Sequence, residues 1–261
     1  LHSHPLSFTV DGQFKVLNPV GMAGSKLECD AIFITALSKD VRGAMRAAEL
    51  AGLMVEDVVA SPIAASRAVL PRRHKEVGSM LMDIGAGTSS IAVFEEGLPI
   101  SLEVLPYGSA NITNDVAQGF KITLDEAEEM KKNFASPAAS VRRQLAEIIS
   151  ARLSDIFELT NKHLKKIERA RLLPAGAVLT GGGARLSEIA GFARDYLELP
   201  TQVGQFDEIR MPEGLDAGPW AVAVGICLMA YDIAKGQPNG GLDIFKKPRS
   251  AISRWLKSLL P

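Results

Sequence analysis

The sequence predicts an α/β fold, because strand patterns and helix patterns alternate along most of its 261 residues. Two of the predicted strands run directly into glycine-rich turns, at Asp83–Thr88 and at Thr180–Ala184. The composition, 47% hydrophobic and 23% charged, is that of globular domains with a hydrophobic core. We therefore expect one or two folded domains.

The first sixty residues predict a small unit of strands and one helix. Alternating apolar residues on both sides of Asp11-Gly12 predict a hairpin. Leu27–Leu37 is expected to form a strand buried at its centre, and Ser38 to cap a helix over Asp40–Ala51. A further strand is expected at Val55–Val59.

The rest of the chain continues the alternation of strands and helices. In chain order we expect a helix at Ile63–Leu70, an exposed turn at Arg72–Glu76, strands at Ser79–Ile84, Ser89–Phe94 and Leu98–Pro106, helices at Asn111–Gln118, Leu124–Phe134 and Val141–Arg171, a strand at Ala177–Leu179, helices at Leu186–Leu197 and Trp220–Ile233, and a flexible linker at Gly236–Gly241.

Charge and cysteine content exclude several classes of function. The net charge is −1, so no overall electrostatic field draws this chain to nucleic acid. Cys29 and Cys227 are far apart in the sequence, which argues against a disulfide framework and against a zinc site. We find no run of about 18 apolar residues and expect no bilayer span. Because the chain starts with Leu1 inside an apolar alternation, we expect its N-terminus to be missing.

The first glycine-rich turn, Asp83-Ile84-Gly85-Ala86-Gly87-Thr88, has the composition of a phosphate-binding loop. Glycines let backbone N–H groups approach an anion closely, and successive N–H groups can form a cradle for phosphate. Asp83 could hold a metal-bound water beside the phosphates, and Thr88 could donate its hydroxyl. The alternative is a tight hairpin turn without a ligand.

The second turn, Thr180-Gly181-Gly182-Gly183-Ala184, follows a strand and opens a helix. Three glycines leave a flat backbone surface on which a base or ribose can lie, beside a helix N-terminus. The alternative is a helix cap made by Thr180. Two such turns, each after a buried strand, predict two loops that converge on one nucleotide.

The order of these motifs resembles the actin/Hsp70 superfamily, in which a second phosphate loop is followed by an adenosine loop. The segment Ala127-Glu128-Glu129-Met130-Lys131 resembles the helix that lies beside the ribose in actin-like proteins. By that resemblance Glu128 and Lys131, one helical turn apart, would face the sugar. The alternative is an ordinary solvated ion pair.

Further segments resemble the FtsA family in particular. They are Asn18–Gly24 (NPVGMAG), Val58–Ser66 (VVASPIAAS), Val104–Gly108 (VLPYG), Thr113–Ala117 (TNDVA) and Ala221–Gly225 (AVAVG). The resemblance implies an actin-like ATPase (ribonuclease H-like) fold with an FtsA-type, SHS2-like extra subdomain. It covers nearly the whole chain.

The C-terminal residues predict a membrane-binding helix. Apolar residues recur at helical spacing, and basic residues surround them, which is typical of a helix lying in an anionic membrane interface. The alternative is a terminal helix docked on the body, but FtsA-like proteins end in a membrane-targeting helix. The predicted membrane-binding residues are Ile252, Arg254, Trp255, Leu256, Lys257, Leu259 and Leu260.

The FtsA resemblance also implies a domain organisation. The expected parts are the extra subdomain at 1–60, a connecting part of the first actin-like subdomain at 61–80, a nucleotide-binding subdomain at 81–117 and 172–235, a shortened upper subdomain at 118–171, a linker at 236–244 and the membrane helix at 245–261.

By the same resemblance, the implied function is that of a division adaptor on the cytoplasmic face of the membrane. ATP and Mg²⁺ are the implied cofactors. The implied partners are the C-terminal tail of FtsZ, other copies of the chain, anionic lipids and other division proteins.

The sequence departs from the family pattern in ways that bear on catalysis. Only one D-x-G-x-x-T motif occurs, Ala86 stands where glycine is common, and Ser89-Ser90 replace a frequent acidic residue. Because of these changes we expect at most a weak ATPase. The stretch from Phe134 to Val141 is shorter than the resemblance leads us to expect, and it lies in the subdomain that receives the FtsZ tail in FtsA. The sequence therefore supports the FtsZ partner less strongly than the membrane attachment. Alternative readings are a PilM-type pilus-assembly adaptor and an ATP-hydrolysing enzyme of the same superfamily.

Overall fold

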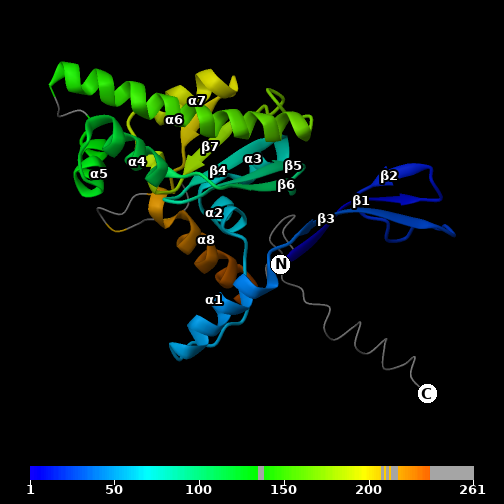
Figure 1. Cartoon of the computed structure of the whole chain (residues 1–261). Coiled ribbons are helices and arrows are strands. Elements are labelled where there is room, and N and C mark those ends of the chain that lie inside the picture. The colour runs from blue at the N-terminus through cyan, green and yellow to red at the C-terminus, as the bar shows by residue number, and fades with distance from the viewer. Residues whose placement is uncertain (135–137, 207–208, 210–211, 213–216, 236–261) are drawn as a thin grey trace. The chain divides into compact units, whose positions relative to one another are not determined.

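The computed structural model describes residues 1–134, 138–206, 209, 212 and 217–235. The chain divides into two compact units. The first comprises Leu1–Val58 together with the residues from Met229 onward, and the second is Val59–Leu228. Figure 1 shows the elements of both units in chain order.

The first unit contains a three-stranded antiparallel sheet of order β2-β1-β3, formed by β1 (His2–Val10), β2 (Phe14–Val16) and β3 (Leu27–Ile34). The predicted hairpin is confirmed, with Val10 paired to Phe14 across the turn. Asp11 and Gly12 both adopt positive φ and are the two central residues of a turn that Gln13 N–H closes by donating to Val10 O. Helix α1 (Ser38–Leu50) follows the sheet.

Three details of the first unit differ from the sequence prediction. The centre of β3 is exposed, because no described element covers Cys29 or Asp30. Ser38 is the first helical residue of α1, and the cap position is Leu37, which makes no side-chain cap. Val55–Val59 is an irregular segment without strand pairing, although its β-branched residues favour a strand.

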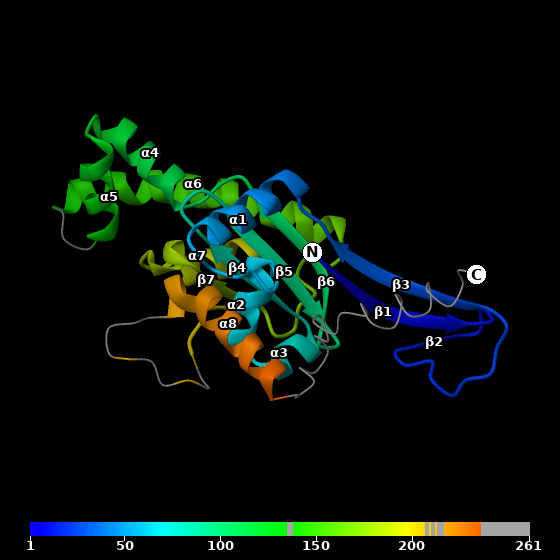
Figure 2. The ribbon, with the colours of Figure 1, turned by 90° about the horizontal axis from the view of Figure 1, so that it is seen from below.

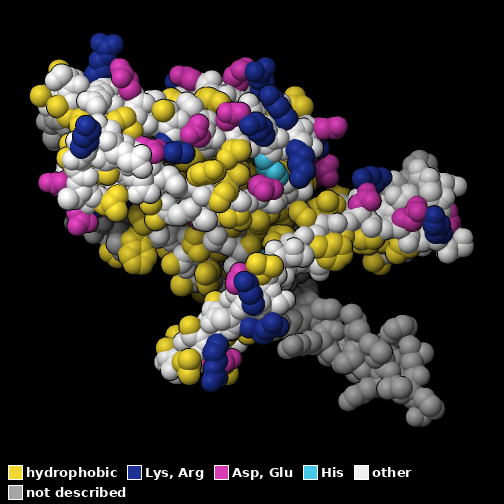
Figure 3. Space-filling view, viewed as in Figure 1, with side chains coloured by type: hydrophobic (Ala, Val, Ile, Leu, Met, Phe, Trp, Pro, Cys, Tyr) yellow, Lys and Arg dark blue, Asp and Glu magenta, His cyan; other side chains and the backbone are white. Residues whose placement is uncertain are grey.

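The apolar side of α1 is not covered by other described residues. None of its residues is buried, although Val41, Ala44, Met45 and Ala48 recur at helical spacing. Figure 3 shows hydrophobic side chains exposed over α1 and over the strands of the first unit. The large ones there include Phe33, Leu37, Leu50, Leu53 and Met54.

The second unit is built on a five-stranded sheet of order β6-β5-β4-β7-β8. Its strands are β4 (Ser79–Ile84), β5 (Ser89–Glu95), β6 (Leu98–Leu105), β7 (Ala177–Thr180) and β8 (Thr201–Val203). The first three form an antiparallel meander, whereas β7 and β8 run parallel to β4. The sequence predicted four of these strands and missed β8, which has only three residues.

Helices cover both faces of this sheet, as Figures 1 and 2 show. Helices α6 and α7 lie on one face, and α2 with the start of α8 lies on the other. The helices are α2 (Ser61–Val69), α3 (Arg72–Val77), α4 (Ser109–Phe120), α5 (Leu124–Lys132), α6 (Ala139–Lys166), the short 3₁₀ helix η1 (Gly182–Arg185), α7 (Ile189–Leu197) and α8 (Ala217–Ala234). The exposed turn expected at Arg72–Glu76 is instead a short helix, in which Lys75 is buried with its Nζ 5.2 Å from the centre of the Phe94 ring.

Helix α8 is long and apolar enough, by length and composition alone, to cross a membrane. The helix lies close to α2 at one point: a Cβ atom added at Gly225 would lie 1.8 Å from the backbone oxygen of Ala64. Such close backbone contact is possible only at a residue without a side chain. The large apolar residues Trp220, Ile226, Tyr231 and Ile233 of α8 stay exposed.

A buried histidine joins α6 to the edge of the sheet. His163 Nε2 lies 2.9 Å from Ser101 Oγ, and its Nδ1 lies 3.5 Å from a Glu103 oxygen. Burial lowers the pKa of His163 below its ordinary 6.5, while Glu103 raises it and Lys166 lowers it. The imidazole is therefore held mainly in its neutral form.

We predict that this histidine makes the second unit less stable in mild acid. Below pH 6.5 the unfolded chain binds a proton at this residue more readily than the folded one, so stability falls as the pH decreases from that value. Replacing it by His163→Gln should reduce the fall in melting temperature between pH 7.5 and 5.5. Thermal unfolding of both proteins measures the difference, and equal pH dependence would contradict the prediction.

Candidate functional site

The two glycine-rich loops meet at the carboxyl ends of β4 and β7, two inner strands of the sheet. β4 and β7 are adjacent parallel strands, and their register places Asp83 opposite Thr180. Each loop begins at the carboxyl end of its strand, and carboxyl ends of parallel strands are the usual place for ligands in α/β proteins. The structure therefore brings together two segments that are about a hundred residues apart in the sequence.

Contacts between the loops explain the glycines of the second one. A Cβ atom at Gly181 would lie 2.4 Å from Ile84 O, and one at Gly183 would lie 2.4 Å from Ile84 Cγ2. Gly182 differs, because its added Cβ would meet nothing within 4 Å. Ala184 is buried behind the loop. The loop is thus fixed on the first one by Gly181 and Gly183, and its open surface is at Gly182.

The first loop is held by the N-terminus of α4. Gly85 N–H donates to Thr88 O, which closes the turn. Ser109 N–H donates to Gly85 O at 2.9 Å, and Ala110 N–H donates to Ala86 O at 2.8 Å. Because the C=O and N–H of a trans peptide point in opposite directions, the amides of Ala86 and Gly87 point away from α4.

This arrangement leaves a surface with backbone N–H groups on which an anion can bind. Ala86, Gly87 and Thr88 are exposed, and a Cβ at Gly87 would meet nothing within 4 Å. Gly108, in contrast, lies so close to the loop that a Cβ there would come within 2.4 Å of Ala86 O. Two backbone N–H groups and the Thr88 hydroxyl are thus available to an anion.

Asp83 has the features expected of a residue that acts beside a cation. Its carboxylate is half-buried and makes no hydrogen bond or ion pair within the part of the chain that the structure describes. Burial raises the pKa of Asp83. A half-buried carboxylate without a partner is stabilised by an approaching cation, so the residue fits a hydrated divalent metal ion.

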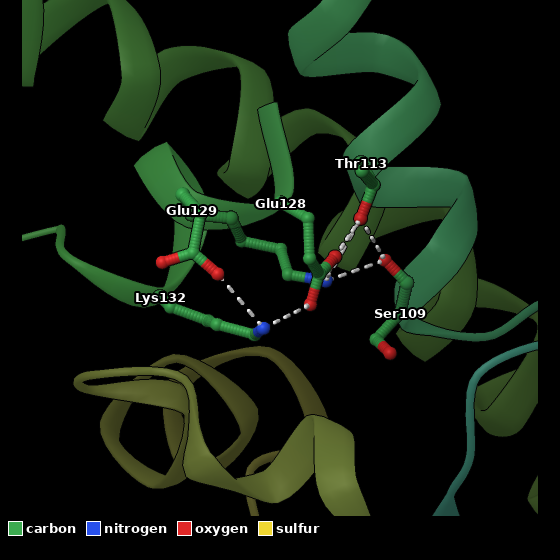
Figure 4. Close-up of polar contacts among 6 residues, drawn as sticks. Ser109, Thr113, Glu128, Glu129 and Lys132 are labelled. Carbon is green, nitrogen blue, oxygen red and sulfur yellow. Dashed lines mark hydrogen bonds and ion pairs between the residues drawn. The ribbon is translucent and has the colours of Figure 1, made fainter. Parts of the chain in front are cut away.

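Glu128 and Lys131 belong to a network that joins α5 to α4, shown in Figure 4. Lys131 Nζ donates to Glu128 Oε2 at 2.7 Å, to Thr113 Oγ1 at 2.8 Å and to Ser109 O at 3.2 Å. Thr113 Oγ1 donates to Glu128 Oε2 at 2.5 Å. The Lys131 side chain is 6% exposed and that of Glu128 36%, so the pair is not the fully solvated ion pair of the alternative interpretation.

Burial raises the pKa of Glu128, but hydrogen bonds from Lys131 and Thr113 outweigh this and lower it overall. Glu128 is therefore ionised at neutral pH. Its other oxygen, Oε1, lies 3.9 Å from Lys132 Nζ. The contact of Glu128 and Lys131 with a sugar stays a prediction.

Sequence reasoning missed the part played by the start of α4. Gly108, Ser109 and Ala110 were assigned to no site, yet their backbones contact the first loop directly. A signal was present, because Gly108 follows a strand and Asn111, three residues later, can accept from its backbone N–H, as it does at 2.9 Å. The predicted membrane residues, Ile252 to Leu260, lie outside the described residues.

The fold and the two loops define a protein with the actin-like ATPase fold. A family model described as "Cell division protein FtsA" matches residues 80–225, and a second, "SHS2 domain inserted in FTSA", matches residues 1–35. The first match covers more than half of the chain, and the chain belongs to the FtsA family of cell division proteins. The predicted family and the SHS2-like subdomain are thereby confirmed.

Known proteins support the same assignment. The cell division protein FtsA of Bacillus subtilis is 29% identical over 271 aligned residues, which include 95% of this chain. The chain spans about 60% of the length of that relative.

Among solved structures, the PilM-PilN type IV pilus biogenesis complex matches with a TM-score of 0.64 at 22% identity, covering 82% of this chain and 64% of the other. The MreB5 protein of Spiroplasma citri bound to ADP matches with a TM-score of 0.63 at 16% identity, covering 77% and 68%. At such identities these likenesses show the actin-like fold alone, and the match to PilM is no argument against the FtsA family.

Proposed function

We propose that the second unit binds ATP where the two glycine-rich loops meet, at the carboxyl ends of β4 and β7. The observation that carries the proposal is the meeting of two loops, one with outward amides at Ala86 and Gly87 and one with an open surface at Gly182. The first would hold phosphate through its amides and Thr88, and the second would support the adenosine. MreB5, which shares the fold, was solved with ADP bound.

Mg²⁺ is the proposed companion of the nucleotide. Asp83 would hold it through a coordinated water, because its carboxylate has no other partner within the described residues. The ion would supply positive charge to the phosphates. Gly85 and Gly183 would keep the loops at their observed separation, and Ala184 would fill the space behind them.

We further propose that the chain acts as a division adaptor. Its FtsA family membership supports association with division proteins, and the basic amphipathic C-terminal sequence supports attachment to anionic lipid on the cytoplasmic face of the membrane. The FtsZ tail and further copies of the chain are the proposed protein partners. The subdomain boundaries expected from the sequence, with 1–60 as the extra subdomain, belong to the same proposal.

ATP in this proposal is mainly a structural ligand. Rapid hydrolysis needs a general base within hydrogen-bond reach of the attacking water. Asp83 is the one carboxylate that the proposal places beside the phosphates, and it serves the metal ion. We therefore propose that any ATPase activity is weak.

We predict that this chain binds ATP with weak affinity. Actin-like sites hold the phosphates between two loops, and only one D-x-G-x-x-T motif occurs here. Each missing charge-assisted hydrogen bond costs about 1.5–3 kcal/mol, so the affinity should lie orders of magnitude below that of a site with two phosphate loops. Saturation-transfer NMR with millimolar ATP and Mg²⁺ should detect binding, whereas calorimetry should not. Micromolar affinity for ATP by calorimetry would contradict the argument that a second phosphate loop is needed for tight binding.

A further inference from the structure

All three N–H bonds of the Lys131 ammonium group already have acceptors within the protein. An ammonium group carries three N–H bonds, and those of Lys131 point to Ser109 O, Thr113 Oγ1 and Glu128 Oε2. Its side chain is 6% exposed, whereas the adjacent Lys132 is 57% exposed. The two lysines of one helix turn therefore stand in different surroundings.

Two hydrogen-bond partners of Lys131 belong to α4, the helix whose N-terminus contacts the phosphate loop. Ser109 and Thr113 both lie in the first turns of α4, and Ser109 is also the residue whose N–H donates to Gly85 O. One peptide further, Ala110 N–H donates to Ala86 O. Lys131 thus holds the carbonyl of the same residue whose amide holds the loop.

We propose that Lys131 is a positioning residue, which sets the orientation of the phosphate-loop amides through α4 rather than by touching the sugar. This refines the proposed nucleotide site and rests on it. Thr113 completes the connection, because it accepts from Lys131 and donates to Glu128. Glu128 Oε1 lies outside these hydrogen bonds, 3.9 Å from Lys132 Nζ.

The first experiment needs no ligand and measures amide hydrogen exchange by NMR. In Lys131→Met, which keeps the apolar stem, the amides of Ser109 and Ala110 should exchange about tenfold faster, as expected when a charge-assisted hydrogen bond to their turn is lost. Thr113→Val should act in the same direction, and Thr113→Ser should restore slow exchange. Lys132→Met is the matched control, because among the described residues the Lys132 ammonium pairs with Glu128 Oε1 and Glu129 and makes no hydrogen bond to Ser109 or Thr113. Unchanged exchange at Ser109 and Ala110 in Lys131→Met would overturn the proposal.

The second experiment compares ATP with adenosine by saturation-transfer NMR. Lys131→Met should weaken ATP binding about tenfold while adenosine binding changes less than twofold, because only the phosphates use the loop amides. An equal loss for both ligands would show contact with the sugar and overturn the proposal. If the wild-type chain bound neither ligand, the nucleotide function would fail, and the exchange measurement would still decide whether Lys131 positions the loop. If Lys131→Met and Thr113→Val made the amides of the whole second unit exchange faster to the same extent, the effect would be general destabilisation, and the proposal would also be overturned.

Discussion

Gly182→Val and Gly87→Val are each expected to abolish ATP binding while leaving the helical circular dichroism signal unchanged. A valine at position 182 would fill the surface proposed for the adenosine, and one at position 87 would block the phosphate cradle. Both positions are open in the ligand-free fold, since an added Cβ meets nothing within 4 Å. Several contacts of roughly 1–3 kcal/mol each would be lost, which removes detectable binding. Saturation-transfer NMR with ATP measures the loss.

Two other glycines serve as comparisons. Gly183→Val would push a side chain into Ile84, so it should lower the melting temperature by an amount equivalent to about 1–3 kcal/mol. Gly43→Val, at an exposed and open position on α1 in the other unit, should leave ATP binding as it is. Normal ATP binding by Gly182→Val or Gly87→Val would show that the two-loop site is wrong.

The sequence predicted the central elements of the second unit because their patterns are local. Residues 79–105 read as three strands separated by turns, and the structure has β4, β5 and β6 there. β4 and β5 are almost wholly buried, so their apolar runs admit few alternatives. The nearness of the two glycine loops could also be anticipated, since each follows a strand of this sheet.

What the sequence did not predict depends on contacts between distant segments. β8 has only three residues and forms because it pairs with β7. No local sequence pattern predicts that pairing. Val55–Val59 has strand propensity but finds no partner strand among the described residues. The polar network of Lys131 was invisible because an i,i+3 pair of charges looks the same in sequence whether it is solvated or buried against another helix.

Removing Phe245–Pro261 is expected to release the protein from anionic vesicles without unfolding it. The predicted apolar stripe consists of Ile252, Trp255, Leu256, Leu259 and Leu260. Each of these side chains gains roughly 1.5–3 kcal/mol when fully buried, and less in an interface where burial is partial. Basic residues near the surface add about 1 kcal/mol each on anionic lipid. Ordering a free tail opposes binding, but the sum favours attachment.

Vesicle co-sedimentation across salt concentrations measures this attachment. Trp255→Glu should reduce binding nearly as much as the deletion, because it places a charge in the centre of the stripe. Ser258→Glu is the matched control, since on a helical projection Ser258 lies outside the stripe on the polar side, and it should cost only the small electrostatic penalty of one added negative charge. Binding should be strong on anionic vesicles and weak on neutral ones, and it should fall as salt screens the lysines and arginines. Unchanged binding after the deletion, or equal binding to neutral vesicles at all salt concentrations, would mean that this segment does not tether the protein to lipid.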